Sequence, residues 1–151
     1  TSSHPGKTRL LNFFLIRWKD DDAGKEGCLQ LTDLPGYGFA EVSQAEQEKW
    51  RRMIHHYFSE RQQLRGIIVL VDIRHEADPK DVQLLELLRL REIDHCVVAT
   101  KADKIPKTKV ARTLDLLGKG LGLQGMPLFP VSALKNTGLA PLYSWLGRHL
   151  N

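Results

Sequence analysis

Hydrophobic and polar positions along the first third of the chain predict two strands and a helix. Residues 10–18 (LLNFFLIRW) and 28–32 (CLQLT) are apolar runs of strand length, and the polar, glycine-containing segment between them has the composition of a hairpin turn. In residues 43–63 the apolar side chains recur at the three- and four-residue spacing of one buried helix face. Ser43, with Glu46 three residues later, forms a capping-box pattern that predicts where this helix begins.

The remainder of the chain alternates predicted strands with predicted helices. Residues 66–71 and 95–100 are continuous apolar runs typical of strands buried on both faces, and residues 128–132 form a shorter one. Helices are predicted at 78–92, where Asp78 and Pro79 mark the start, at 107–121 and at 137–150. We therefore expect an α/β fold with a mostly parallel sheet, one antiparallel edge strand and flanking helices. In such sheets the chemistry lies in loops at the carboxyl ends of the strands.

Composition narrows the class of protein. The 151 residues suit one domain, and 42% hydrophobic with 26% charged content argues against global disorder. Cys28 and Cys96 lie in apolar runs without a CxxC pattern, which predicts reduced core residues of a cytoplasmic protein. Apolar runs fall short of the roughly 18 residues that span a bilayer. The net charge of +4 mildly favours an anionic partner without identifying one.

The first motif, DLPG, follows the apolar run 28–32 and consists of Asp33, Leu34, Pro35 and Gly36. A carboxylate at this place can hold Mg²⁺ through water, and a glycine can offer its N–H to a terminal phosphate. Taken alone, the same tetrapeptide is more often a Pro-Gly turn after a strand.

The second and third motifs suit guanine. TKAD consists of Thr100, Lys101, Ala102 and Asp103, and SALK begins at Ser132 and Ala133 after the run that includes Val131. A carboxylate can accept hydrogen bonds from both the N1–H and the 2-amino group of guanine, a pattern that adenine cannot donate, and a lysine stem can cover the base plane. A small residue after the last strand lets a backbone N–H approach the guanine O6. Individually, each motif can also be an ordinary solvated loop.

The order of the three motifs is the stronger signal. DxxG, TKAD and SALK match the third, fourth and fifth signatures of P-loop GTPases in the correct sequence. With DLPGYGF from residue 33, DIRH from residue 72 and PGKT from residue 5, the chain resembles the EngB (YihA/YsxC) family of bacterial GTPases. The resemblance covers essentially the whole chain. It implies a Ras-like P-loop GTPase fold and a cytoplasmic GTP/GDP switch with Mg²⁺ that serves large ribosomal subunit assembly, and hence growth, septation and cell division.

The resemblance implies a monomer. Its macromolecular partner would be the large ribosomal subunit, with its RNA and proteins, and it would bind neither DNA nor a membrane. The resemblance also implies which residues bind the nucleotide. The phosphate-side switch I segment would be Gly6, Lys7, Thr8, Arg9 and Leu10, with Thr8 a direct Mg²⁺ ligand. Asp33 would hold Mg²⁺ through water beside Leu34, Pro35 and Gly36, while Thr100, Lys101, Ala102, Asp103, Val131, Ser132 and Ala133 would contact guanine. No catalytic residue is assigned. Tyr37 stands where Ras-like enzymes place a water-orienting glutamine, so we expect slow hydrolysis without a partner, although Tyr37 can also simply pack.

PGKT invites a second interpretation, as the end of a Walker A loop. That pattern needs Gly or Ala at position 1, which is Thr, and a helix after Thr8, where a strand is predicted. We therefore expect residues 1–151 to run from switch I to the C-terminal helix of an EngB-type G domain. The phosphate loop, its strand and its helix would lie in roughly 40–55 residues upstream. The alternative function is a degenerate, nucleotide-free module that binds RNA or the ribosome.

Three further features have weaker interpretations. His55 and His56 are adjacent on the predicted helix and point about 100° apart, so they cannot chelate a metal together. Arg74 and His75 have no assigned role. Seven basic residues form either a surface for ribosomal RNA or an ordinary solvated face: Arg51, Arg52, Arg61, Arg65, Lys104, Lys107 and Lys109.

Overall fold

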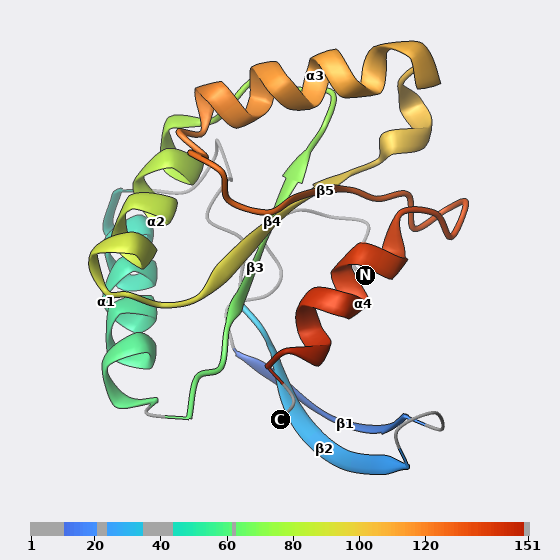
Figure 1. Ribbon diagram of the computed structural model, residues 1–151. Coiled ribbons are helices and arrows are strands. Elements are labelled where there is room, and N and C mark those ends of the chain that lie inside the picture. Colours follow the sequence, from blue (N-terminus) through green and yellow to red (C-terminus); the bar gives the residue numbers. More distant parts are fainter. Residues whose placement is uncertain (1–10, 21–23, 35–43, 62, 150–151) are drawn as a thin grey trace. The chain divides into compact units, whose positions relative to one another are not determined.

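The computed structural model describes residues 11–20, 24–34, 44–61 and 63–149. The chain divides after residue 62 into two compact units, and each is described by itself. The first unit holds a β-hairpin and one helix, and the second alternates strands with helices (Figure 1). The second unit has the strand and helix order that the hydrophobic pattern predicts, and the α/β class is confirmed.

The hairpin of the first unit consists of β1 (Asn12–Asp20) and β2 (Lys25–Asp33), paired antiparallel over their whole length. The register runs from Asn12 opposite Asp33 to Asp20 opposite Lys25. Gly24 adopts a φ of 63° at the turn, a value that glycine reaches without the steric cost of a Cβ. The predicted antiparallel pairing is therefore present, as a two-stranded sheet.

Helix α1 (Gln44–Glu60) confirms the predicted helix, although its predicted cap Ser43 lies outside the described residues. Ile54 and Phe58 are buried. One turn apart, Tyr57 and Arg61 reach the hairpin. The Tyr57 hydroxyl donates to Thr32 Oγ1 at 2.9 Å, and the Arg61 guanidinium lies 5.3 Å from the centre of the Phe13 ring. These polar and cation–π contacts attach the end of the helix to one face of the hairpin.

The second unit is built on a parallel sheet of β3 (Ile67–Asp72), β4 (His95–Thr100) and β5 (Leu128–Pro130), in the order β3-β4-β5. The central strand β4 is buried from His95 to Ala99, as expected for a parallel strand covered on both faces. Asp72 pairs with Thr100 in the register, which sets the ends of β3 and β4 side by side. The last strand stops at Pro130, two residues before the predicted end.

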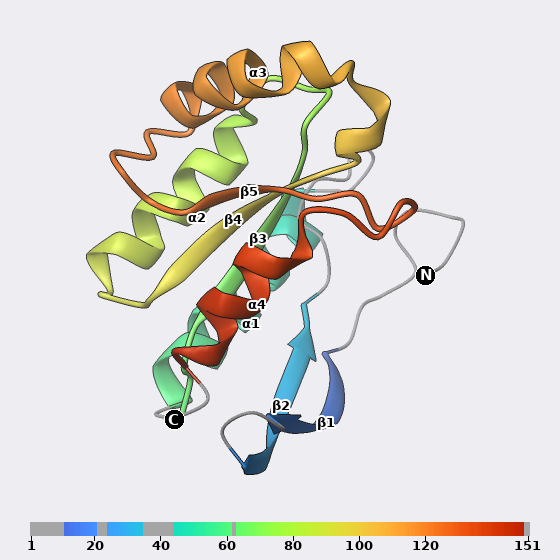
Figure 2. The same ribbon diagram turned by 45° about the vertical axis from the view of Figure 1, so that its right-hand side comes forward.

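Helices α2 (Pro79–Leu90) and α3 (Lys107–Gly120) lie on the side of this sheet opposite α4 (Leu139–Gly147), as Figures 1 and 2 show. The Asp78 carboxylate caps α2 by accepting a hydrogen bond from the Lys80 N–H at 2.8 Å, with Pro79 in the first turn, as predicted. The apolar spacing in residues 137–150 predicts that Leu139, Leu142 and Leu146 face inward. In the structure these leucines are only partly buried, and the buried residue of α4 is Trp145, whose ring would lie 2.8 Å from a Cβ on Gly66.

The two cysteines differ in environment, and the prediction that both are core residues was wrong for one of them. Cys96 is buried in β4, and burial raises the pKa of its thiol to about 12. Cys28 is exposed, because β2 belongs to a two-stranded hairpin that does not cover both of its faces. No helix within the described ranges is long and apolar enough to span a membrane.

Candidate functional site

The TKAD loop follows β4 directly and is held by the end of β3. The Thr100 hydroxyl donates to the Val71 carbonyl at 2.9 Å, and the Ile73 N–H donates to the Thr100 carbonyl at 3.1 Å. Lys101 adopts left-handed backbone angles (φ 60°, ψ 33°), and a short 3₁₀ turn, η1 (Ala102–Lys104), follows. A non-glycine residue in this conformation costs of order 1–3 kcal/mol, which the surrounding hydrogen bonds must offset. Hydrogen bonds to the end of β3 therefore hold the start of the loop.

The Asp103 carboxylate lies against the loop after β5. The buried Ser132 hydroxyl donates to Asp103 Oδ1 at 2.5 Å, and Ser132 Oγ itself accepts the Lys135 N–H at 3.1 Å. Only 5% of the Asp103 side chain is exposed. The hydrogen bond from Ser132, with the nearby charge of Lys104, holds the pKa of Asp103 below its ordinary value. Asp103 is consequently an ionised acceptor in a set orientation.

Backbone hydrogen bonds join the two loops into one surface. The Ala102 N–H donates to the Val131 carbonyl at 3.1 Å, and the Val131 N–H donates to the Ala99 carbonyl at 2.9 Å. Ser132 and Thr137 exchange both backbone hydrogen bonds and close the second loop at its base. The structure thus brings the predicted TKAD residues together with Val131, Ser132 and Ala133 at the carboxyl ends of adjacent parallel strands.

An ionic cluster that the motif argument missed lies beside this surface. The Arg74 guanidinium donates to both oxygens of Asp72, at 2.9 and 2.7 Å, and Lys101 Nζ lies 2.8 Å from Asp72 Oδ2. Hydrogen bonds from Arg74, assisted by Lys101, hold the pKa of Asp72 far below its ordinary range. The DIRH sequence was the available signal, because Asp72 ends a strand beside the TKAD strand.

The phosphate-side predictions fall mainly outside the described residues. Gly6, Lys7, Thr8, Arg9, Leu10, Pro35, Gly36 and Tyr37 all belong to that undescribed part. Asp33 is the last residue of β2, in the first unit, and is exposed, with Leu34 directly after it. A solvent-accessible carboxylate at a strand end has the oxygen chemistry that Mg²⁺ prefers, so Asp33 fits a metal held through water.

Metal coordination by histidine has no support in the described part of the chain. His55 and His56 are both exposed on α1. No group of three or more His, Cys, Asp or Glu there is arranged to hold a metal ion.

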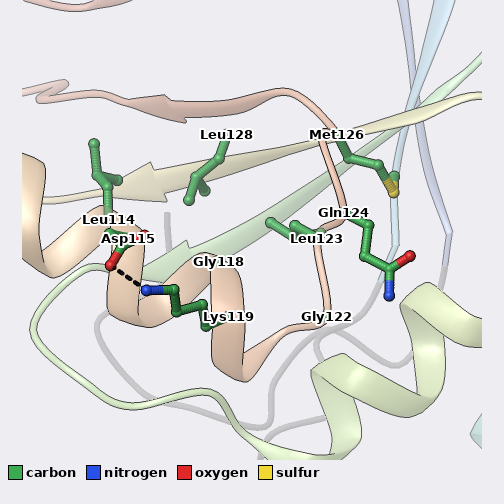
Figure 3. Close-up of a pocket in the computed structure, with 9 residues that line it drawn as sticks. All are labelled: Leu114, Asp115, Gly118, Lys119, Gly122, Leu123, Gln124, Met126 and Leu128. Atoms are coloured by element: carbon green, nitrogen blue, oxygen red, sulfur yellow. Dashed lines mark hydrogen bonds and ion pairs between the residues drawn. The ribbon is translucent and has the colours of Figure 1, made fainter.

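A hollow of about 610 Å³ lies between α3 and the segment entering β5, at the amino end of that strand (Figure 3). Its lining includes the apolar side chains of Leu114, Met126 and Leu128. The ion pair between Asp115 and Lys119, with 2.8 Å between Nζ and Oδ2, lies among the lining residues. None of the three motifs contributes to this hollow, so it is separate from the candidate site.

Comparison with known proteins shows which family the chain belongs to. The family model described as 50S ribosome-binding GTPase matches residues 1–101. The probable GTP-binding protein EngB of Ligilactobacillus salivarius is 45% identical over 147 residues, which are 97% of this chain and 70% of that protein. The chain belongs to the EngB family of GTP-binding GTPases. The EngB protein of Pelotomaculum thermopropionicum, 42% identical over 148 residues, likewise aligns with 97% of this chain and 70% of its own length.

A solved structure supports the fold of this EngB-family chain independently. The crystal structure of a probable GTP-binding protein EngB superposes with a TM-score of 0.67, covering 80% of this chain and 76% of that one. Only 22% of the residues are identical, so the match bears on the fold. The predicted family and the Ras-like P-loop GTPase fold are both confirmed.

Proposed function

We propose that this EngB-family chain reads guanine through the surface formed by the TKAD loop and the loop after β5. The observation that carries the proposal is the orientation of Asp103, fixed by the buried Ser132 hydroxyl at 2.5 Å. An ionised carboxylate only accepts hydrogen bonds, and the Watson–Crick edge of guanine offers two adjacent donors where adenine offers a different pattern. The Lys101 stem covers the base plane, and a backbone N–H near Ser132 and Ala133 meets the guanine O6.

The reaction that we propose is hydrolysis of GTP to GDP and phosphate, with residues 6–10 and 33–36 on the phosphate side. Thr8 would bind Mg²⁺ directly and Asp33 through water, while Gly36 would offer its N–H to the terminal phosphate. The metal, when bound, neutralises charge on the phosphate oxygens. Loss of the terminal phosphate would release these segments and switch the protein to its second state. Tyr37, in the place of a water-orienting glutamine, makes the unaided reaction slow.

The partner that we propose is the large ribosomal subunit, in its assembly, with consequences for growth, septation and cell division. The description of the matching family, 50S ribosome-binding GTPase, supports a ribosomal partner. The exposed cations Lys104, Lys107 and Lys109 on and beside α3 supply charge that suits RNA phosphates. The unpaired, exposed Cys28 agrees with a reducing compartment, so we propose a cytoplasmic location. We also propose that the protein is a monomer.

Two measurements on the full-length protein test this function. Calorimetric titration should give binding of GDP and no binding of ADP, since only guanine matches the Asp103 acceptor. Large subunits should sediment with the protein in the presence of a non-hydrolysable GTP analogue and release it with GDP, and added subunits should raise the hydrolysis rate. Equal binding of ADP and GDP would contradict guanine recognition, and sedimentation that ignores the nucleotide would contradict the switch.

A further inference from the structure

The ionic cluster at the end of β3 is built more tightly than a surface ion pair. Arg74 donates to Asp72 from Nε at 2.9 Å and Nη2 at 2.7 Å, and its backbone N–H donates to Oδ1 at 3.1 Å. Paired bonds from a planar guanidinium fix the plane of a carboxylate as well as its position. The Asp72 side chain is only 19% exposed, which protects the pair from solvent screening. The carboxylate therefore has one orientation.

This oriented carboxylate is shared with the TKAD loop. Lys101 Nζ lies 2.8 Å from Asp72 Oδ2, although the Lys101 side chain is 54% exposed. Burial does not restrict such a side chain, so the ion pair is what restrains its flexible stem. The strand register supports the arrangement, because Asp72 lies opposite Thr100, the residue before Lys101.

We propose that Asp72 and Arg74 are positioning residues, which hold the Lys101 side chain in place for the guanine base. The inference rests on the proposed function, in which the Lys101 stem covers the base. A free lysine would lose its rotamer freedom when the nucleotide binds, at a cost to affinity, whereas a restrained lysine has already lost it. Arg74 acts one step further away, by fixing the carboxylate that holds Lys101. Arginine is needed there because lysine cannot donate two parallel hydrogen bonds.

The test measures fluorescent GDP binding in the full-length protein carrying Asp72→Asn, Lys101→Ala or both. Asp72→Asn should raise the GDP dissociation constant about three- to tenfold, the range for ordering one rotamer-rich side chain on binding. In the Lys101→Ala background the same substitution should change affinity less than twofold, since no lysine remains to be held. Arg74→Ala should raise the GDP dissociation constant about as much as Asp72→Asn does, and Arg74→Lys should raise it less than Arg74→Ala.

Asp115→Asn is the matched control, because it removes one carboxylate from an ion pair of the same 2.8 Å length in the same unit. It should leave GDP affinity unchanged. Because it changes the net charge as Asp72→Asn does, it shows how much of any effect comes from charge alone. A general folding defect would lower affinity equally with and without Lys101, and that result would overturn the positioning role. If the wild-type protein binds GDP, and Asp72→Asn and Asp115→Asn bind it with the same dissociation constant, the positioning role would also be overturned. The proposed function would stand in that case. Absence of GDP binding by the wild-type protein would overturn both.

Discussion

Replacing Ser132 with alanine tests how the candidate guanine surface is organised. The hydroxyl donates to Asp103 at 2.5 Å and accepts the Lys135 N–H at 3.1 Å, and the side chain that does both is 1% exposed. Removing the acceptor of a part-buried N–H costs about 1–3 kcal/mol. At about 2–4 °C per kcal/mol for a chain of 150–250 residues, a 2 kcal/mol loss lowers Tm by roughly 4–8 °C.

Nucleotide affinity should respond as well. Without the Ser132 hydrogen bond, the pKa of Asp103 rises toward its ordinary value, because that bond is the largest cause of its lowered pKa. Since the ionised carboxylate is the form that accepts guanine, GDP binding in Ser132→Ala should fail at a higher pH as the solution is acidified. At neutral pH the dissociation constant should rise about three- to tenfold, as the carboxylate must be ordered on binding.

The assay is thermal unfolding together with fluorescent GDP titrations between about pH 3 and pH 7, a range that extends below the ordinary aspartate pKa. Ser144→Ala is the control, because it removes an exposed hydroxyl that donates to the Ala140 carbonyl within α4, away from the site. If Ser132→Ala and Ser144→Ala gave the same Tm and the same pH profile of binding, the reasoning about Ser132 would be refuted.

Three further predictions concern strain, thiols and pH. Gly138 and Gly125 share a φ of 79°, but only at Gly138 would a Cβ collide with the Pro130 carbonyl. Gly125→Ala should lower the unfolding free energy by the roughly 1–2 kcal/mol of left-handed strain. Gly138→Ala should lower it by well more than that, and urea titration of both variants measures the difference. A thiol reagent should label the exposed Cys28 in the native protein and the buried Cys96 only after unfolding; equal rates would contradict the burial. Because the pKa of Asp72 is lowered in the folded state, its contribution to stability is present above about pH 4 and declines as the pH falls. The unfolding free energies of the wild type and of Asp72→Asn should therefore differ at pH 7 and converge in acid.

The sequence predicted the second unit well because its strands are buried on both faces. Strand β4 has the predicted bounds, 95–100, since a continuous apolar run of this length is typical of a parallel strand covered on both faces. The meeting of Asp103 and Ser132 also follows from the pattern, because parallel strands end at one edge of the sheet. The hydroxyl-to-carboxylate bond itself depends on the backbone path of two loops, which no residue spacing specifies.

Other features depend on contacts between distant residues. The contact between Asp72 and Lys101 needs the register of β3 against β4, which the apolar runs leave undetermined. Full burial of Trp145, beside leucines that are only partly buried, depends on the space left by Gly66 just before β3. Cys28 lies in an apolar run yet is exposed, because a run predicts a strand without predicting which element covers it. The left-handed backbone of Lys101 is likewise set by surrounding hydrogen bonds.

The central claim is that Asp103 reads guanine, and nucleotide exchange in Asp103→Asn tests it most directly. Asparagine keeps the shape of the side chain and replaces one acceptor oxygen with a donor amide. Titration of the full-length variant should show loss of GDP binding and gain of binding to xanthosine diphosphate, whose base carries a carbonyl where guanine carries its amino group. Unchanged GDP affinity in Asp103→Asn, with xanthosine diphosphate still unbound, would contradict the account.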